Sequence, residues 1–542
     1  MFYVFIIVIV SGIAVLVNMY YSRKRKKLIL SLWDKNEKLD HTENFHETFT
    51  YLYENVNLNK EKNAVVDHIT WHDLNLTKIF KTINFTFTSI GEELLYYRLK
   101  APHETHLFEE KKIEKISINK EYRTKLSLIL SALGKAPYAN SSKYIYAKPD
   151  SSFNKIYILL GLLPIIGLAI IGFSLQIGLG LFFISILVNS FLFYINRSKN
   201  EAEYESLFYC LTILLTSRNI AKLNQDTDFL KKTSKLKSAP FISVFLLKDD
   251  PTGTNLILQL FTMLKSIFLI DYFVFHYIVY LINNNSQTYE LAWRKTAEID
   301  LYYSIALWRK TLPYYCLPEY TDNDSLTIVN GYHPLVSNPV GNDFEFTQNS
   351  LLTGSNASGK STFIKTIAVN IIFSQALNTS TSHKIRLTRG EVYSSMAMSD
   401  DIEKGQSYFL SEIKALKRIF DRRNNSSDML LYVFMDEIFK GTNTMERVAA
   451  AESVLEYLNH CSNTKIMAAT HDIELTEMLN DKYKNYHFRE QIVDDEIIFD
   501  FLIKEGASNT RNAIELLRIT GFPEKVYLHA VNKAKELNNS LI

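Results

Sequence analysis

The chain has 542 residues, of which 47% are hydrophobic, and a formal net charge of +2 at pH 7. Its length favours about three or four domains. The nearly neutral charge argues against a broad basic surface for DNA, so any DNA contact would be local or supplied by the geometry of a dimer. Cys210, Cys316 and Cys461 are far apart, without the paired spacing of a zinc site or a disulfide framework, which suits a reducing compartment for the soluble part.

The first predicted element is a membrane anchor at residues 2–21, an almost unbroken apolar run. About 20 helical residues span the ~30 Å hydrocarbon core of a bilayer. Basic residues 23–27 follow, no basic residue precedes the run, and no small-x-small cleavage site follows it, so we expect the segment to be retained. The positive-inside rule then places the chain from residue 22 onward in the cytoplasm. A hydrophobic core helix is the alternative.

A second apolar block runs from Ile156 to Ile195, with a turn-forming stretch at residues 172–176 near its centre. It predicts a transmembrane hairpin, assigned to residues 154–197, with two spans of about 19 residues. Lys155 and Arg197 flank the block, as expected for a hairpin whose two ends are both cytoplasmic.

A third apolar segment, Phe261–Ile282, contains Lys265, Asp271 and His276. A charge at the bilayer centre costs about 2.5–3.5 kcal/mol, and a further crossing would place the C-terminal region outside the cell. We therefore expect a long buried or membrane-apposed helix of the core. The predicted order is an anchor (1–22), a juxtamembrane segment (23–66), a helical core in two parts (67–153 and 198–320) separated by the hairpin (154–197), and an α/β domain (321–542).

The α/β domain contains a complete phosphate-binding loop at residues 354–361, with the pattern G-x-x-x-x-G-K-[ST]. Its glycines let backbone N–H groups point at the phosphates of a nucleotide, Lys360 reaches the β- and γ-phosphates, and the Ser361 hydroxyl ligates Mg²⁺. Ser350–Thr353 predicts a buried strand before the loop, and helical spacing of apolar residues predicts a helix after it. The predicted nucleotide-binding residues are Gly354, Ser355, Asn356, Ala357, Ser358, Gly359, Lys360, Ser361 and Thr362.

Two later strands end in polar residues. The apolar run Met429–Met435 suits a buried parallel strand and ends in Asp436 and Glu437. Asp436 is the expected partner of Mg²⁺, and Glu437 is placed to orient or deprotonate the attacking water. Lys465–Thr470 predicts another strand, and His471 after it is expected at the same sheet edge, in contact with the γ-phosphate or water. A surface acidic pair and a structural histidine are the alternatives.

These motifs resemble the ATPase domain of MutS proteins. The similar stretches are Gly331–Leu335, Thr353–Asn356, Met435–Thr444 and Ala469–Leu475. Residues 506–508 and 521–523, followed by a helix through Ala534, are similar to the MutS C-terminal helical element. Upstream, residues 71–95 and 297–318 are similar to the MutS core.

The resemblance implies an ATP- and Mg²⁺-dependent ATPase that acts as a homodimer, with DNA as a possible partner in mismatch repair or damage recognition. Residues 405–412 are similar to the MutS segment whose serine completes the site of the partner subunit, so Ser407 is expected to contact the nucleotide across the dimer interface. MutS proteins stack an aromatic residue on adenine, and Phe344 is the first candidate for this role, with Phe346 and Tyr332 as alternatives.

The resemblance has one large gap. Mismatch-reading MutS proteins carry an N-terminal domain with a Phe-x-Glu motif, and no such domain fits before Trp71. Phe108-Glu109-Glu110 contains these letters but follows the core motif, and a clamp region of the usual length has no room. We therefore do not expect this chain to recognise mismatches through that domain.

The leading interpretation is a MutS-like ATPase anchored in the cell inner (plasma) membrane by several helices, with its ATPase domain in the cytoplasm. One alternative is a nucleotide-switched membrane scaffold that binds protein rather than DNA, which the neutral charge favours. The other is the ATPase of an ABC-type transporter. Residues 404–407 are not the glycine-rich signature of that class, and three spans are few for a translocation path.

Overall fold

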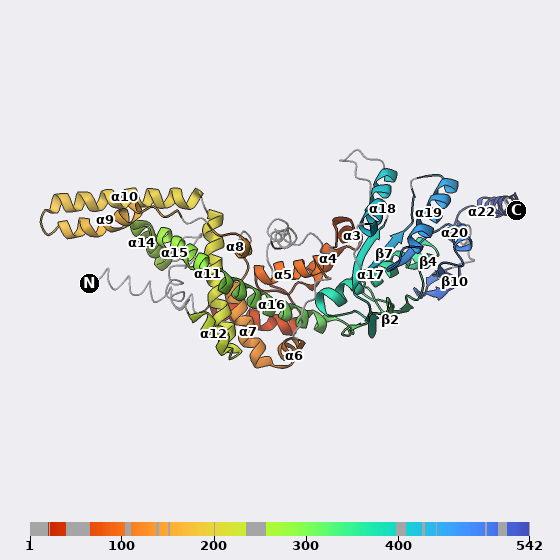
Figure 1. The fold of residues 1–542 in the computed structure, drawn as a ribbon, viewed down its shortest axis with the longest axis horizontal. Coiled ribbons are helices and arrows are strands. Elements are labelled where there is room, and N and C mark those ends of the chain that lie inside the picture. Colours follow the sequence, from red (N-terminus) through yellow and green to blue (C-terminus); the bar gives the residue numbers. More distant parts are fainter. Residues whose placement is uncertain are drawn as a thin grey trace. The chain divides into compact units, whose positions relative to one another are not determined.

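The computed structural model describes residues 20, 22–39, 52, 66–102, 110–136, 140–149, 152–199, 201–234, 256–396, 408–424, 429–440, 442–493, 496–507 and 517–540. The chain forms two compact units. A helical unit comprises Met1–Glu61, Ile83–Tyr97 and Glu109–Thr311, and an α/β unit comprises Lys62–Thr82, Arg98–Phe108 and Leu312–Ile542. All strands that the structure describes lie in the α/β unit (Figure 1).

The helical unit is built around one long buried helix, α16 (Ser286–Thr311), which packs against α6 and α11. Its other helices include α6 (Glu110–Ile118), α7 (Lys120–Leu133), α8 (Lys143–Tyr146), α9 (Ile156–Ile170), α10 (Leu175–Lys199), α11 (Glu201–Leu223), α12 (Thr227–Lys232), α14 (Leu256–Phe268) and α15 (Ile270–Asn284), while α5 (Ser89–Lys100) begins in this unit.

Asp300 on α16 joins the two upstream stretches that resemble the MutS core. Its carboxylate accepts hydrogen bonds from the backbone N–H groups of Phe87, at 3.0 Å, and Thr88, at 2.8 Å, and from the Thr88 hydroxyl. Gly91 approaches so closely that a Cβ there would collide with the carboxylate. Burial raises the pKa of Asp300 to about 6, although these hydrogen bonds oppose the rise.

The predicted hairpin forms, because α9 and α10 pack side by side along their length (Figure 1). Its two helices differ in length, with 15 residues in α9 and 25 in α10, rather than about 19 each. Within the described part of the chain, α10 is the one unbroken helix that is both long enough and apolar enough to cross a membrane. The predicted anchor at 2–21 lies outside the described residues, apart from Tyr20.

The prediction of one long helix at Phe261–Ile282 is wrong. The segment contains two helices, α14 and α15, which are bent by 76° at a break. Leu269, at the break, has a left-handed backbone with φ of 52°. Leucine disfavours this backbone conformation. Leu269 is buried, and the packing of its side chain compensates for the cost.

The α/β unit contains a six-stranded sheet in the order β12-β9-β4-β8-β7-β6, a four-stranded sheet in the order β1-β5-β2-β3, and a separate pair, β10-β11. The strands are β1 (Glu319–Tyr320), β2 (Leu326–Gly331), β3 (Asn342–Glu345), β4 (Ser350–Thr353), β5 (Lys384–Leu387), β6 (Gly390–Ser395), β7 (Leu430–Asp436), β8 (Thr464–Ala469), β9 (Lys484–His487), β10 (Glu490–Val493), β11 (Glu496–Phe499) and β12 (Lys504–Glu505).

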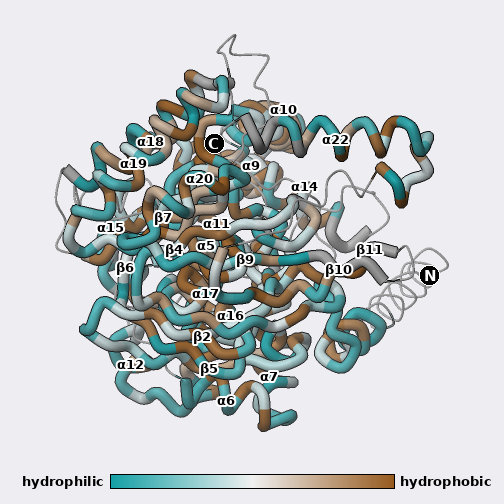
Figure 2. Tube along the Cα trace, turned by 90° about the vertical axis from the view of Figure 1, so that its right-hand side faces the viewer, coloured by the Kyte–Doolittle hydropathy of each residue, from teal (hydrophilic) through white to brown (hydrophobic). Residues whose placement is uncertain are grey.

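The helices of this unit that carry the site flank the larger sheet. Side chains of α18, α19 and α20 form one apolar cluster with residues of β7 and β8, whereas α17 contacts β6, β7 and β8 without belonging to that cluster. The helices are α3 (His68–Asp73), α4 (Leu76–Ile83), α17 (Lys360–Leu377), α18 (Tyr408–Asn424), α19 (Thr444–Asn459), α20 (Ile473–Met478) and α22 (Glu524–Ser540). Hydrophobic and hydrophilic residues alternate along α22 (Figure 2).

Helix α3 covers the edge strand β6. Asp73 accepts hydrogen bonds from the Ser394 hydroxyl, at 2.7 Å, and from the backbone N–H of Met396, at 3.1 Å, and Arg418 of α18 forms an ion pair with Asp67. Burial raises the pKa of Asp73, and both hydrogen bonds oppose the rise. The predicted boundaries placed residues 67–82 in the helical core, whereas here they belong to the α/β unit.

Candidate nucleotide-binding site

The phosphate-binding loop lies between β4 and α17, as the sequence predicts. Gly354 and Gly359 have φ angles of 132° and 105°, which side chains rarely adopt, and a Cβ at Gly354 would collide with the carbonyl oxygen of Phe488. Lys360 is the first residue of α17 and is buried. Its Nζ donates a hydrogen bond to the Gly354 carbonyl at 2.5 Å, so the lysine reaches back across the loop that it is expected to serve.

The three predicted strand ends meet at one edge of the sheet. Leu352 of β4 is the register partner of Ala469 of β8, which in turn pairs with Asp436 of β7. Beyond the strands, the Glu437 N–H donates to the Ala469 carbonyl at 3.0 Å, and the Thr470 N–H donates to the Leu352 carbonyl at 2.9 Å. The sheet therefore brings the phosphate loop, the acidic pair and His471 together, as expected for the carboxyl ends of parallel strands.

Asp436 is suited to a hydrated cation. Its Oδ1 is buried and has no hydrogen-bond partner among the described residues, and a buried carboxylate oxygen without a partner is costly unless a ligand or water satisfies it. Within the described ranges, no group of three or more His, Cys, Asp and Glu side chains is arranged to hold a metal ion by itself. Mg²⁺ bound with a nucleotide needs none, because it takes most of its oxygen ligands from phosphates and water. The buried Oδ1 of Asp436 thus suits the ion.

Glu437 is held between two nitrogen groups. Its carboxylate lies 3.0 Å from Nε2 of His471 and forms an ion pair with Lys440, while its backbone is left-handed, with φ of 57°. Burial lowers the pKa of His471, and the positive charges of Lys360 and Lys440 lower it further. A lowered pKa favours the neutral imidazole. Because an ionised carboxylate can only accept, its bond with Glu437 requires the tautomer that carries the proton on Nε2. This fixes the carboxylate at the end of β7.

The loop after β8 is anchored by a two-point ion pair. Arg447 of α19 donates to both carboxylate oxygens of Asp472, at 2.9 and 2.6 Å. The Asp472 N–H donates to the Thr470 hydroxyl at 3.0 Å. Because Asp472 follows His471 directly, these bonds restrict the position of the histidine.

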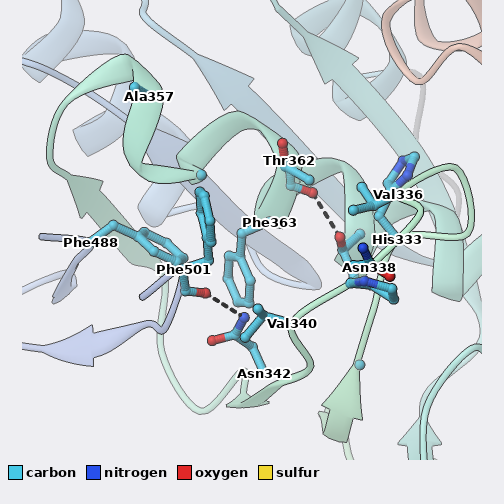
Figure 3. A pocket seen from close by; sticks show the side chains of 14 residues that line it. His333, Val336, Asn338, Val340, Asn342, Ala357, Thr362, Phe363, Phe488 and Phe501 are labelled. Atoms are coloured by element: carbon cyan, nitrogen blue, oxygen red, sulfur yellow. Dashed lines mark hydrogen bonds between the residues drawn. The ribbon is translucent and has the colours of Figure 1, made fainter. Parts of the chain in front are cut away.

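A pocket of about 230 Å³ opens beside the phosphate loop (Figure 3). Its lining is largely apolar or aromatic, with a few polar side chains, as is usual for a site that takes a nucleotide base. The lining residues are Gly331, His333, Val336, Asn338, Pro339, Val340, Asn342, Ala357, Gly359, Thr362, Phe363, Thr366, Phe488 and Phe501. Burial lowers the pKa of His333 to about 4, with a smaller effect from Lys365, so this imidazole is neutral.

Phe501 and Phe488 are aromatic residues of this pocket that sequence reasoning missed, and Phe501 is the one whose position is fixed by Asn342. Asn342 fixes the backbone around it. Its Nδ2 donates to the Phe501 carbonyl at 2.9 Å (Figure 3), and its Oδ1 accepts from the Ile503 N–H at 2.8 Å. Phe501 has a φ of 52°, and its ring lies next to Gly359, where a Cβ would approach Cδ1 to 3.2 Å. The only sequence signal was the position of Phe501 shortly before residues 506–508.

The expected aromatic contacts with adenine are instead core residues. Phe344 is buried against Phe346, Phe363 and Tyr486, and Tyr332 is buried with its hydroxyl bonded to the carbonyl of Tyr314. None of the three candidates lines the pocket. Buried and exposed side chains alternate along β3, and Phe344 is one of the buried ones, so it packs in the core. Ser407 lies outside the described residues.

This fold and site define a P-loop nucleotide-binding domain. Residues 350–538 match the family model of MutS domain V. The chain is 29% identical over 262 residues to the DNA mismatch repair protein MutS of Acetivibrio thermocellus, covering 46% of this chain and 29% of the relative. It is 32% identical over 232 residues to that of Fusobacterium nucleatum, covering 40% of this chain and 25% of the relative.

A third relative, the DNA mismatch repair protein MutS of Clostridium kluyveri, is 32% identical over 245 residues, which cover 42% of this chain and 27% of the relative. Residues 350–538 are therefore similar to domain V of MutS proteins. It spans between 25% and 29% of the length of these relatives.

Proposed function

We propose that this chain binds ATP with Mg²⁺ and hydrolyses it. The observation that carries the proposal is the meeting of Lys360, Asp436, Glu437 and His471 at the ends of three neighbouring strands. A phosphate loop alone supports nucleotide binding, whereas a carboxylate held beside a neutral imidazole supplies what hydrolysis needs in addition.

Each residue has a distinct part in this mechanism. Backbone N–H groups of the loop and the N-terminus of α17 hold the phosphates, and Lys360 exchanges its bond to the Gly354 carbonyl for the β- and γ-phosphates. Ser361 and Asp436 hold Mg²⁺, which neutralises charge on the phosphates. Glu437 accepts the proton of the attacking water. His471 orients that carboxylate through its Nε2–H.

The base is proposed to stack on Phe501. Phe501→Ala should weaken ATP binding by about 1–3 kcal/mol, the usual worth of base–aromatic stacking, or roughly 5- to 150-fold. Binding of Mg²⁺-tripolyphosphate, which has no base, should be unchanged. Titration calorimetry measures both constants. Phe346→Leu is the matched control, because Phe346 is aromatic but buried away from the pocket. Equal ATP affinity in Phe501→Ala and the wild type would contradict the assignment.

A homodimer with DNA as its ligand is the second part of the proposal. It is supported by the names of the relatives and by the resemblance of residues 405–412 to the segment that contributes a serine to the partner's site. A nucleic-acid titration at two salt concentrations tests it, since contacts to phosphates make log affinity fall with log salt. Absence of binding at both concentrations would favour a nucleotide-switched scaffold that binds protein. The low net charge of +2 is consistent with that alternative.

The chain is further proposed to be integral to the inner (plasma) membrane, with its ATPase domain in the cytoplasm. The hairpin supports this, because its inner face consists of small or polar residues and its outer face is apolar. The inward residues include Gly161, Gly167, Gly178, Ser185 and Asn189. The exposed large side chains include Ile158, Leu162, Ile165, Leu168, Ile177, Phe183, Leu187 and Phe191. Water does not favour such a surface, whereas hydrocarbon does.

Cysteine labelling of intact cells with an impermeant reagent tests this topology. In a chain without its natural cysteines, Phe173→Cys in the hairpin turn should react, because Phe173 is 93% exposed. Lys417→Cys on α18 should not react until the cells are opened, although its side chain is 67% exposed. Labelling of Lys417→Cys in intact cells would place the nucleotide site on the wrong side of the membrane.

A further inference from the structure

Helix α14 lies against the hairpin rather than in the core of the helical unit. It packs on both α10 and α9. Its opposite face is apolar and open, since Leu260, Met263 and Leu264 are each about half exposed, at 56%, 55% and 48%. Helix α15, beyond the break, differs in that Ile278, Val279 and Ile282 are fully buried. The two halves of the predicted helix therefore have different surroundings.

The break leaves carbonyl groups at the end of α14 without partners in their own helix, and the hairpin supplies one. Asn189 of α10 is completely buried, and its Nδ2 donates to the carbonyls of Ile267 and Leu160, each at 2.8 Å. One amide thus ties α14 to both hairpin helices. Gly161 permits this approach, because a Cβ there would lie 3.2 Å from the Phe268 carbonyl.

The contacts also set the depth of α14 along the hairpin. Ser266 lies 3.4 Å from Ser190, measured between hydroxyl oxygens. Asp271, beyond the break, forms an ion pair with Arg197 at 3.0 Å. Ser190 and Arg197 are separated by about two helical turns, or about 10 Å. The end of α14 is therefore displaced from the charged base of the hairpin toward its tip.

The charged residues of α14 and α15 face the protein. Lys265 is 2% exposed and Asp271 is 4% exposed, and their side chains lie 3.7 Å apart. Charged groups directed inward and paired, with apolar groups directed outward, are the arrangement found in membrane-embedded helices. A helix in water would show the reverse arrangement.

We propose that α14 is embedded in the cytoplasmic leaflet beside the hairpin, with lipid acyl chains against Leu260, Met263 and Leu264. This inference rests on the proposed membrane insertion of the hairpin. With 13 residues, or about 20 Å, α14 is too short to cross ~30 Å of hydrocarbon, and α15 returns into the helical unit. Asn189 satisfies a backbone carbonyl at a depth where water is absent.

Spin labelling of the full chain in phospholipid vesicles tests the proposal. A nitroxide is attached to Met263→Cys in a chain in which Cys210, Cys316 and Cys461 are replaced. Its collision rate with oxygen, which concentrates in lipid, is compared with that of a water-soluble nickel chelate. Leu187→Cys on α10, 72% exposed, is the lipid control, and Lys125→Cys on α7, 57% exposed, is the water control.

The expected result is an accessibility ratio at position 263 that matches position 187. A ratio matching position 125, with position 187 in lipid, would overturn the placement of α14 and leave the hairpin in the membrane. A water-like ratio at both 263 and 187 would instead overturn the membrane insertion in the proposed function. Protection of position 263 from both reagents would mean that protein covers this face, which also overturns the proposal.

Asn189→Leu separates the role of this amide from general packing. Loss of the bond to the Ile267 carbonyl should move the ratio at position 263 toward the water control, while that at position 187 stays in lipid. Asn196→Leu, lower on α10, is the matched control, since Asn196 bonds Tyr157 and not α14. Equal ratios in Asn189→Leu and the parent chain would show that Asn189 does not hold α14 in place.

Discussion

Lys360→Ala should abolish ATP binding while the chain remains folded. Lys360 is completely buried, and its Nζ is already directed at the loop, where it bonds the Gly354 carbonyl. Its removal takes away the point charge that the phosphate-loop pattern provides for the β- and γ-phosphates.

Thermal unfolding with and without Mg²⁺-ATP measures this effect. A ligand that binds only the folded state at 100 times its Kd stabilises that state by about 2.7 kcal/mol. The wild type should show this stabilisation and Lys360→Ala should show none. Lys384→Ala on β5, an exposed lysine of the same domain, should behave as the wild type. If ATP raised the melting temperature of Lys360→Ala as much as that of the wild type, the site would have to lie elsewhere.

Glu437→Gln should bind ATP and fail to hydrolyse it. Glutamine keeps the shape of the side chain and an oxygen that accepts from His471 Nε2, but it cannot take a proton from water. Loss of a general base costs about 10²- to 10⁴-fold in rate. ATP should therefore accumulate on the protein.

Rapid filtration with labelled ATP, combined with a phosphate-release assay, separates binding from hydrolysis. Glu477→Gln on α20 is a matched control, because Glu477 is an exposed carboxylate of the same domain that takes no part in the site. Phosphate release at the wild-type rate in Glu437→Gln would show that another group is the base. His471 would then be the next residue to replace.

Much of the site could be predicted from the sequence because its information is local. The loop pattern at 354–361 requires glycines for its backbone angles and a lysine for the phosphates, so eight neighbouring residues specify both structure and chemistry. The continuous apolar run Met429–Met435 likewise predicted β7 as a strand buried on both faces, and the shorter stretches Ser350–Thr353 and Lys465–Thr470 predicted β4 and β8. Polar residues follow each of these stretches. Because the carboxyl ends of parallel strands meet at one edge of a sheet, the sequence predicted that these polar residues lie together.

The base pocket could not be predicted in this way. Asn342 and Phe501 are 159 positions apart, and no periodicity connects them. Phe344 was the better candidate by spacing alone, but the pleat of β3 turns it into the core, and the clamp on Phe501 brings a distant ring to the phosphate loop. Aromatic residues are common both in protein cores and in pockets that bind a base. Only the residues that surround an aromatic ring in the folded structure therefore decide which of the two roles it has.

The hairpin and the two helices after α12 show the same division. The hairpin could be predicted from composition, because the apolar block Ile156–Ile195 has a turn-forming stretch at residues 172–176 near its centre. The break at Leu269 was decided by tertiary structure alone. Neither glycine nor proline marks it, and its left-handed backbone is held by contacts with residues far away in sequence, Asn189 on one side and Arg197 on the other. Local propensity predicted a continuous helix, and long-range packing outweighed it.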